Sequence, residues 1–345
     1  MASIDLTVRG AGIFGLSIAW TATQRGARVR VIDPNGPASG SSGGIVGALA
    51  PHVPENWNPK KQFQLESLLM AGHFWTAVEE KGGGNAGYAR LGRLQPIKDD
   101  HALSLARQRA ETAKDLWKAA AVWEVLAADT LSEPSSSKSG YIIRDTLTAR
   151  IQPRHACEAL VRALKSSGVE IVADAAAPGQ TVWATGVAGL EDLSQDHHRA
   201  VGTGVKGQAA LFDLDARDAP QLFVDGLHIV PHHDGTTAVG STSERVYADP
   251  HLTDEKLDAL VEEAFDALPA LRQAKLIARW AGVRPRARSR APMLGPWPRH
   301  PGHFIANGGF KIGFGIAPKV AEVMTDLILE GRDRIPDGFR LEDSF

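Results

Sequence analysis

The sequence predicts an α/β protein in which a three-layer nucleotide-binding core is assembled from both ends of the chain, around an inserted α+β part with an antiparallel sheet. Three features of its 345 residues predict this arrangement. The N-terminus alternates strand, glycine turn, helix and strand, the middle contains a β-hairpin signature, and the C-terminus runs from a strand through glycines into a helix. Alternating elements of this kind pack as helices on a mostly parallel sheet.

The first unit surrounds the run GAGIFG at residues 10–15. Residues 4–8 are β-prone, residues 13–24 carry the small and apolar side chains of a helix that ends before Gly26, and residues 27–32 are β-prone again. This order of elements is that of a Rossmann-like dinucleotide-binding unit. A glycine turn that merely packs against its neighbours is the alternative.

The glycines of this unit have separate expected tasks. Gly10 permits the tight turn, Gly12 lets a pyrophosphate approach the backbone, and Gly15 lets the helix meet the sheet. Asp33, about 20 residues further on, would accept hydrogen bonds from a ribose 2′-hydroxyl, which argues against NADP. We therefore expect a dinucleotide without a 2′-phosphate.

The remaining elements follow from periodicity and from helix-ending and turn residues. They are an inward-folding loop at 39–52, a solvent loop at 82–85, helices at 102–123 and 153–167, strands at 169–172 and 181–184, a hairpin at 227–242 that turns at 233–235, a helix at 254–268 capped by Thr253, and a final helix at 319–330 closed by Gly331. The sequence contains no internal repeat, and it contains no linker that would separate independent domains.

Composition excludes several classes of protein. The net charge of -2 gives no general attraction to nucleic acid, so none is expected as a partner. The N-terminus lacks a signal peptide and no stretch approaches the length of a membrane span, so we expect a cytoplasmic protein without membrane insertion. The only cysteine, Cys157, excludes an intramolecular disulfide and is expected inside an amphipathic helix as a buried structural residue.

Several further motifs, in this order, resemble the FAD-dependent amine and amino-acid oxidoreductases typified by glycine oxidase, D-amino-acid oxidase and sarcosine oxidase. They are SGGIVGALAP at 42–51, LGRL at 91–94, IQPR at 151–154, VWATG at 182–186, VKGQ at 205–208, WAGVRP at 280–285 and NGGFKIG at 307–313. Where the family has an extra β-hairpin that touches the adenine, this chain has only residues 173–181. The likeness covers nearly the whole chain.

The resemblance implies FAD rather than NAD as the cofactor. It also implies non-covalent binding, because Cys157 lies far from the segment 290–294 where sarcosine-oxidase-like members attach the flavin. The residues that would hold FAD by this resemblance are Gly10, Gly12, Ile13, Phe14, Gly15, Asp33, Ser41, Ser42, Gly47, Ala48, Leu49, Ala184, Gly186, Gly308, Gly309, Phe310, Lys311, Ile312 and Gly313. The glycines at 308, 309 and 313 could present backbone N–H groups to the flavin.

The resemblance further implies an expected division of the chain. Residues 1–80, 140–204 and 281–345 would form a discontinuous FAD-binding domain, and residues 81–139 and 205–280 a substrate domain.

The resemblance implies oxidation of the amine of a small amino acid: glycine, a D-amino acid or an N-alkyl glycine. A hydride would pass to flavin N5, the resulting imine would hydrolyse to an oxo-acid, and oxygen or another acceptor would take the electrons. Arg284 would grip the substrate carboxylate through its bidentate fork, and Lys311 would be a second contact to the carboxylate or flavin. A flavin step of tRNA wobble-uridine modification and a non-catalytic FAD-binding protein are the alternatives.

Other polar residues leave their roles open. His52 either faces the substrate or ends its loop, and Tyr247 either presents its hydroxyl to the substrate or packs in the core. The histidine pairs 197–198 and 232–233 are expected to be solvated loop residues rather than metal ligands, so no metal is predicted.

The run RPRARSR at 284–290 places four arginines at every second position. In an extended segment these side chains share one face. They form either a basic edge or a site for a substrate with a second negative group. The sequence says nothing about the oligomeric state.

Overall fold

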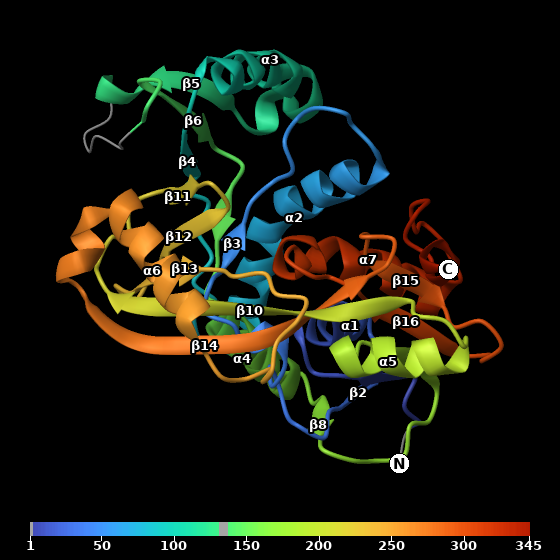
Figure 1. The fold of residues 1–345 in the computed structure, drawn as a ribbon. Helices are drawn as coiled ribbons and strands as arrows, with labels where there is room; N and C mark the ends of the chain where they lie inside the picture. The colour runs from blue at the N-terminus through green and yellow to red at the C-terminus, as the bar shows by residue number, and fades with distance from the viewer. Residues whose placement is uncertain (1–2, 131–136) are drawn as a thin grey trace.

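The computed structural model describes residues 3–130 and 137–345. Its strands form two large sheets, as Figure 1 shows, and a two-stranded ladder that pairs β3 (Ala48–Leu49) with β7 (Ala149–Arg150). The mixed α/β class predicted from the sequence is confirmed.

The first large sheet is the core of the nucleotide-binding part. Its six strands run in the order β15 (Met293–Pro296), β16 (His303–Asn307), β9 (Gln180–Trp183), β1 (Leu6–Arg9), β2 (Val29–Ile32) and β8 (Glu170–Val172). All neighbours pair in parallel except β15 and β16, which are antiparallel. Strands from both ends of the chain therefore share one sheet, as predicted.

Four helices pack together beside this sheet. They are α1 (Ile13–Gln24), α2 (Pro59–Gly82), α4 (Pro153–Ser166) and α7 (Gly313–Glu330). The bounds of α1 equal the predicted ones, and Gly26 follows its end with a φ of +84°, a conformation that glycine adopts without strain. Cys157 is buried in α4, as predicted, and its burial raises the pKa of the thiol to about 12.

The second large sheet carries eight strands. Their order is β14 (Lys275–Ala287), β10 (Gly202–Asp213), β13 (Thr237–Gly240), β12 (Leu227–Pro231), β11 (Gln221–Val224), β4 (Arg93–Pro96), β6 (Tyr141–Asp145) and β5 (Trp123–Ala127). β11 and β4 are parallel and the other neighbours are antiparallel. The predicted hairpin is confirmed as β12 and β13, whose paired residues run from His228 with Gly240 to Pro231 with Thr237, next to the turn.

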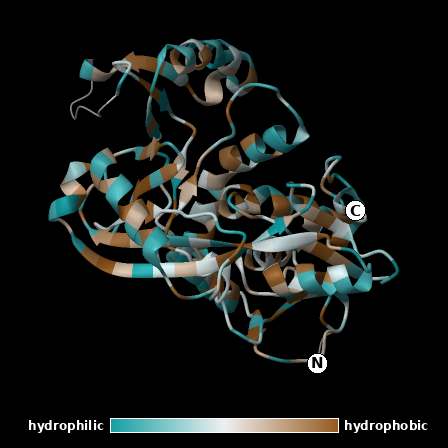
Figure 2. Ribbon diagram, viewed as in Figure 1, coloured by the Kyte–Doolittle hydropathy of each residue, from teal (hydrophilic) through white to brown (hydrophobic). Residues whose placement is uncertain are grey.

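Helices cover parts of this second sheet. α6 (Glu255–Ala267) buries Leu257, Leu260 and Ala264 against β10, β12 and β13, while Figure 2 shows the rest of α6 as mostly hydrophilic. α3 (Asp100–Trp117) packs on β5, and α5 (Gly186–Asp196) packs on the long strands β10 and β14 (Figure 1). β10 and β14 thereby link the two halves of the molecule.

Three predicted helix bounds are wrong. The helix expected at 102–123 ends at Trp117, and β5 begins at Trp123. The chain reverses between them because the Trp123 ring packs on the Trp117 ring, with the ring centres 5.9 Å apart. The helix after Thr253 is capped instead by Asp254, whose carboxylate accepts from the Lys256 N–H at 3.1 Å.

The final helix begins at Gly313 rather than at Lys319. Glycine and the internal Pro318 both disfavour a helix, so local propensity argues for a later start. Packing of α7 against α1 and α2 overrides that propensity.

Helix α2 was not among the elements predicted from the sequence. Asn58 caps it through a hydrogen bond from the Lys61 N–H at 3.1 Å, and Pro59 occupies the first turn. Leu68, Ala71, Trp75 and Val78 are buried at spacings of a helix, so an Asn-Pro cap followed by apolar periodicity was an available signal.

The expected domain division remains a prediction. All strands of the six-stranded sheet fall in the segments assigned to the FAD-binding domain. β6, however, lies at 141–145 and pairs with β4 and β5 of the other sheet, although the boundary at residue 140 had placed it with the FAD-binding domain. By sheet membership the boundary falls after β6.

Candidate cofactor and substrate site

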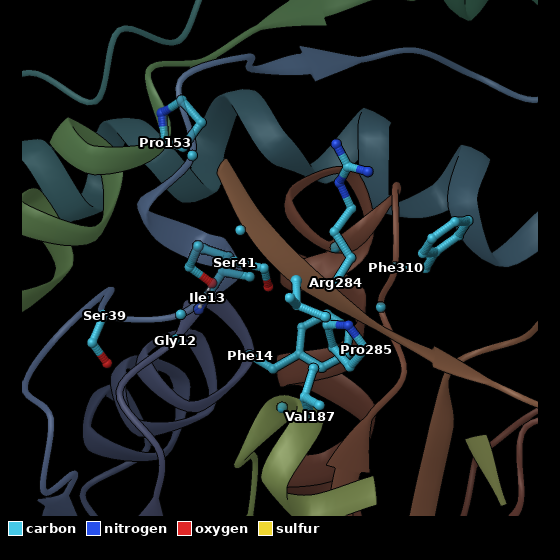
Figure 3. Close-up of a pocket in the computed structure, with 18 of the residues that line it drawn as sticks. Gly12, Ile13, Phe14, Ser39, Ser41, Pro153, Val187, Arg284, Pro285 and Phe310 are labelled. Atoms are coloured by element: carbon cyan, nitrogen blue, oxygen red, sulfur yellow. Dashed lines mark hydrogen bonds between the residues drawn. The ribbon is translucent and has the colours of Figure 1, made fainter. Parts of the chain in front are cut away.

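A cavity of about 1090 Å³ lies where the two sheets meet. Figure 3 shows Gly12, Ile13 and Ser41 at one end, and Arg284 and Phe310 at the other. The predicted residues that line it are Gly10, Gly12, Ile13, Phe14, Asp33, Ser41, Ser42, Gly47, Ala48, Ala184, Gly186, Tyr247, Arg284, Gly308, Gly309, Phe310, Lys311 and Gly313. Gly15, Leu49, Ile312 and His52 are not among its lining residues.

The turn before α1 presents free backbone donors to the cavity. No side chain caps this helix, and the N–H groups of Gly12 and Phe14 have no acceptor within the described parts of the chain. The Ile13 N–H donates to Ser42 Oγ at 3.0 Å. Unpaired N–H groups and the positive end of the helix dipole form an anion site that suits a pyrophosphate.

Steric crowding explains why Gly10 and Gly15 of this turn are glycines. A Cβ on Gly10 would lie 2.4 Å from Ala184 O, and one on Gly15 would lie 1.9 Å from Gly10 O. A Cβ on Gly12, by contrast, would lie 3.1 Å from Ser42 Oγ, beside the open cavity. Gly10 and Gly15 therefore serve packing, while Gly12 keeps the cavity wall flat.

Asp33 stands at the end of β2 and lines the same end of the cavity. Its Oδ2 accepts from the Ala11 N–H at 2.7 Å and its Oδ1 from the Asn35 N–H at 3.0 Å. Each carboxylate oxygen has a further lone pair, so a ribose hydroxyl can still donate to it.

The loop at 39–52 folds inward over the cavity, as predicted. Ser41–Gly43 form a 3₁₀ turn, and Gly47 lies so close to Ile151 that a Cβ there would be 1.6 Å from Ile151 O. The Ile151 N–H donates to Gly47 O at 2.9 Å, and Leu49 is buried in the core. Gly47 thus allows this loop to lie against the start of α4.

A second helix N-terminus points into the cavity from α7. No side chain caps it, and Gly308, Gly309 and Gly313 line the wall in front of it. A Cβ on Gly309 would lie 2.8 Å from Phe14 Cζ. Glycine at this position lets the turn approach the Phe14 ring of α1 without displacing it, and its backbone donors face the cavity.

Arg284 is the buried cation at the far end. It is 9% exposed, and its guanidinium donates to Ser241 Oγ at 2.6 Å and to Thr242 O at 3.2 Å. Burial lowers its pKa to about 10, and the attraction of Glu244 opposes this effect. The residue stays charged at neutral pH, and two of its five N–H donors are used, which leaves donors for a ligand.

Lys311 joins Arg284 at this end because the turn before α7 is tied to β14. The Phe310 N–H donates to Pro285 O at 3.0 Å. Burial and the charge of Arg284 lower the pKa of Lys311. Phe310 has a φ of +43°, a left-handed conformation that costs a non-glycine residue about 1 kcal/mol or more. Such strain persists where neighbouring contacts hold the backbone.

Of the other two predicted substrate residues, Tyr247 lies in the cavity wall and His52 does not. Tyr247 lines the cavity, and its hydroxyl lies 3.2 Å from where a Cβ on Gly204 would be. His52 is turned away: its N–H donates to Gln64 Oε1 at 2.7 Å and its ring Nδ1 contacts the same oxygen. Tyr247 therefore lines the cavity and His52 does not, while their roles toward a substrate remain predictions.

Several lining residues were not singled out from the sequence. His228 on β12 lies in the cavity wall with its ring 4.6 Å from Phe223, and burial together with Arg93 and Lys311 lowers its pKa to about 3. Trp280, Ser241, Trp183 and Arg9 also line the cavity. Trp280 belongs to the same motif as Arg284, WAGVRP at 280–285, so this motif could have predicted that Trp280 lies in the cavity wall.

The prediction that the histidines at 232–233 are solvated is wrong for His232. His232 is 2% exposed rather than solvated, its Nδ1 contacts Thr236 Oγ1 at 3.1 Å, and burial lowers its pKa to about 4. A hairpin turn was expected to be solvent-exposed, but this one packs against Gln152, whose Oε1 contacts His233 Nδ1 at 2.8 Å. Among the described residues no group of three or more His, Cys, Asp or Glu could hold a metal.

The arginine run also differs from a continuous extended face. β14 ends at Ala287, and Arg290 has a φ of +63°, so the two-residue repeat ends there. Only Arg284 and Arg286 share a strand face.

The fold and this cavity define a dinucleotide-binding α/β protein with a second, cationic ligand site at the far end. The chain belongs to the FAD dependent oxidoreductase family, whose model matches residues 5–327. The free N–H groups at the two helix ends and the glycine walls fit FAD, which is the cofactor of this family.

Relatives of known activity share sequence or fold with it. The chain is 36% identical over 134 residues to glycine oxidase of Pseudomonas putida, a match that covers 39% of this chain and 36% of that enzyme. It is 26% identical over 365 residues to glycine oxidase of Bacillus licheniformis, covering 94% and 93% of the two chains.

A solved structure shows the same fold. The crystal structure of iminodiacetate oxidase from Chelativorans sp. BNC1 matches with a TM-score of 0.85 at 22% identity, over 97% of this chain and 98% of that one. The matched part spans 36% of the length of the Pseudomonas putida enzyme. In the described residues no helix is long and apolar enough to cross a membrane.

Proposed function

We propose that this protein oxidises the amine of a small amino acid: glycine, a D-amino acid or an N-alkyl glycine. The observation that carries the proposal is the buried guanidinium of Arg284, held by two neutral oxygens at the end of the cofactor cavity. A fixed, charged fork in a cofactor cavity suits a carboxylate that must be oriented for reaction. The names of the glycine oxidases and of the iminodiacetate oxidase support a carboxylate-bearing amine.

When bound, FAD would supply the acceptor for a hydride from the substrate α-carbon, and water would hydrolyse the resulting imine to an oxo-acid and ammonia or a smaller amine. Arg284 binds the carboxylate and sets the distance of the α-carbon from the cavity wall. The uncapped N-terminus of α7 would supply N–H donors that stabilise negative charge on the reduced cofactor. No nucleophile from the chain is required.

The charges of the site also favour the reactive form of the amine. Only the neutral amine carries the lone pair that assists hydride loss. Burial and then the charge of Arg284 lower the pKa of Lys311, and the two positive charges lower the pKa of a bound ammonium by the same like-charge repulsion. His228, neutral because its pKa is lowered to about 3, can accept a hydrogen bond from the amine without adding charge.

The test is the anaerobic visible spectrum of the FAD-loaded protein before and after addition of glycine, sarcosine, D-alanine, D-proline, D-aspartate or iminodiacetate. Bleaching by at least one of them is the expected result. Arg284→Gln should raise KM for that substrate by about a hundredfold, since a charge-assisted bidentate contact contributes about 2 to 3 kcal/mol. A flavin that stays oxidised with every carboxylate-bearing amine would favour a non-catalytic FAD protein instead.

A further inference from the structure

The carboxylates around Arg284 are paired with lysines, and Arg284 makes no ion pair of its own among the described residues. Glu244, 7% exposed, pairs with Lys256 at 2.9 Å. Asp254 pairs with the buried Lys206 at 3.6 Å. Arg284 itself donates to neutral oxygens, and in the described part of the chain it makes no ion pair. The charge of Glu244 is therefore already matched by Lys256.

Lys311 adds a second unmatched positive charge at the same end of the cavity. The carboxylates that line the cavity are Asp33, held at the Ala11 N–H, and Glu191 on the exposed side of α5. Neither is among the charges that shift the pKa of Arg284 or Lys311. Two cations thus face the ligand space; Glu244 attracts Arg284 but is itself paired with Lys256.

Three more cations, here named the outer cations, continue this charge toward solvent: Lys60, Arg286 and Arg290. The Arg286 guanidinium lies 5.5 Å and Lys311 Nζ lies 5.9 Å from the centre of the Phe310 ring. Lys60 donates to the backbone oxygen of Arg290, and burial, followed by the charges of Arg286 and Arg290, lowers the pKa of Lys60. None of the three makes an ion pair within residues 3–130 and 137–345.

We propose that the substrate of this site carries a second anionic group, a carboxylate or a phosphonate, which binds at Lys311 after passing the outer cations. This inference rests on the proposed function and deepens it. Arg284 holds the carboxylate next to the reacting carbon, and the second group lies on the Phe310 side.

Charge balance favours such a substrate over glycine. A substrate with one carboxylate and a neutral amine matches Arg284 and leaves the charge of Lys311 without a counter-charge from the ligand. A substrate with two anionic groups matches both. The outer cations raise the local concentration of a doubly charged ligand more than that of a singly charged one, and salt weakens this effect.

Binding of unreactive ligands tests, without turnover, whether the site prefers two anionic groups to one; this preference is called the charge rule below. Succinate and butyrate have equal chain length and differ by one carboxylate. In the FAD-loaded protein, the shift of the flavin spectrum should give succinate a Kd about tenfold or more below that of butyrate, which corresponds to about 1.4 kcal/mol for one further ion pair. The ratio should shrink as salt is raised.

Variants locate the effect. Lys311→Gln should remove most of the preference for succinate, and Arg286→Gln should weaken succinate binding at low salt with less change at high salt. Arg288→Gln is the matched control, since Arg288 belongs to the same arginine run, is exposed and is not among the charges acting on Lys60. The flavin spectrum of each variant reports folding.

Turnover then distinguishes this inference from the proposed function. D-Aspartate should reduce the flavin at a higher kcat/KM than D-asparagine, and iminodiacetate at a higher value than sarcosine; 2-amino-3-phosphonopropionate tests the phosphonate. Equal Kd values for succinate and butyrate, or equal loss of both in Lys311→Gln, would overturn the inference while oxidation of glycine still stood. Tight succinate binding without bleaching by any amine would support the charge rule and refute the oxidase.

Discussion

The guanidinium of Arg284 on β14 lies over Gly207 of the neighbouring strand β10, two residues along from Val205, the residue that pairs with Arg284. A Cβ on Gly207 would lie 2.0 Å from Arg284 Nη2. The absence of a side chain on β10 therefore provides the space in which the guanidinium sits. Arg284 reaches Ser241 and Thr242 because of this space.

Gly207→Ala should displace the guanidinium of Arg284 and weaken carboxylate binding with little loss of FAD. We expect KM for the best substrate to rise by about tenfold or more, because one or both hydrogen bonds of the buried cation are lost. Gly72→Ala is the control, since a Cβ there would meet nothing closer than 3.8 Å. Wild-type KM in Gly207→Ala would mean that β10 shifts to admit the methyl group.

Gly12 and Gly15 should fail in different ways. Gly12→Val should give a folded protein that is purified without yellow colour, because the side chain would project beside the open cavity where the pyrophosphate is expected. Gly15→Val should fail to fold, because a Cβ would lie 1.9 Å from Gly10 O. Circular dichroism and the flavin absorbance separate the two outcomes, and a yellow Gly12→Val protein would contradict the assignment of this turn.

Stability should fall as the pH falls below 6.5, because His232 is buried in its neutral form. Burial lowers its pKa from 6.5 to about 4, so between these values the unfolded chain binds a proton that the folded chain does not. The free energy of unfolding therefore rises with pH in this window, by on the order of 2 kcal/mol between about pH 5 and 7.5. Urea unfolding with saturating FAD measures it.

His232→Gln tests the origin of this pH dependence. The variant lacks the titrating group, so its difference in stability between the two pH values should be smaller than that of the wild type. His228, with a pKa of about 3, acts in the same direction but is present in both proteins. An undiminished difference in the variant would assign the effect to other residues.

Cys157 should be inert in the folded protein. It is buried in α4, and the pKa of its thiol is raised to about 12, so it carries almost no thiolate at neutral pH. A thiol reagent such as a disulfide chromophore should react with no group in buffer and with one group per chain in urea. Rapid reaction of the native protein would show that α4 opens locally.

Local signals allowed some elements to be predicted closely. The bounds of α1 are those predicted, because its apolar residues and Gly26 act within one segment. The β12–β13 hairpin likewise follows from two β-prone runs around Gly235. The start of α7 and the end of α3 could not be predicted, since contacts with distant elements override the propensities of Pro318 and of the residues after Trp117.

The sequence by itself determined the dinucleotide turn, the motifs of the family and the two residues, Arg284 and Lys311, on which the substrate proposal rests. Only the tertiary structure decided which charges are matched. Glu244 pairs with Lys256, whereas the Phe310 N–H bond to Pro285 O brings Lys311 to Arg284. The physical reason is that compensation of charge depends on distance and burial in three dimensions, and side chains far apart in the sequence supply or withhold it.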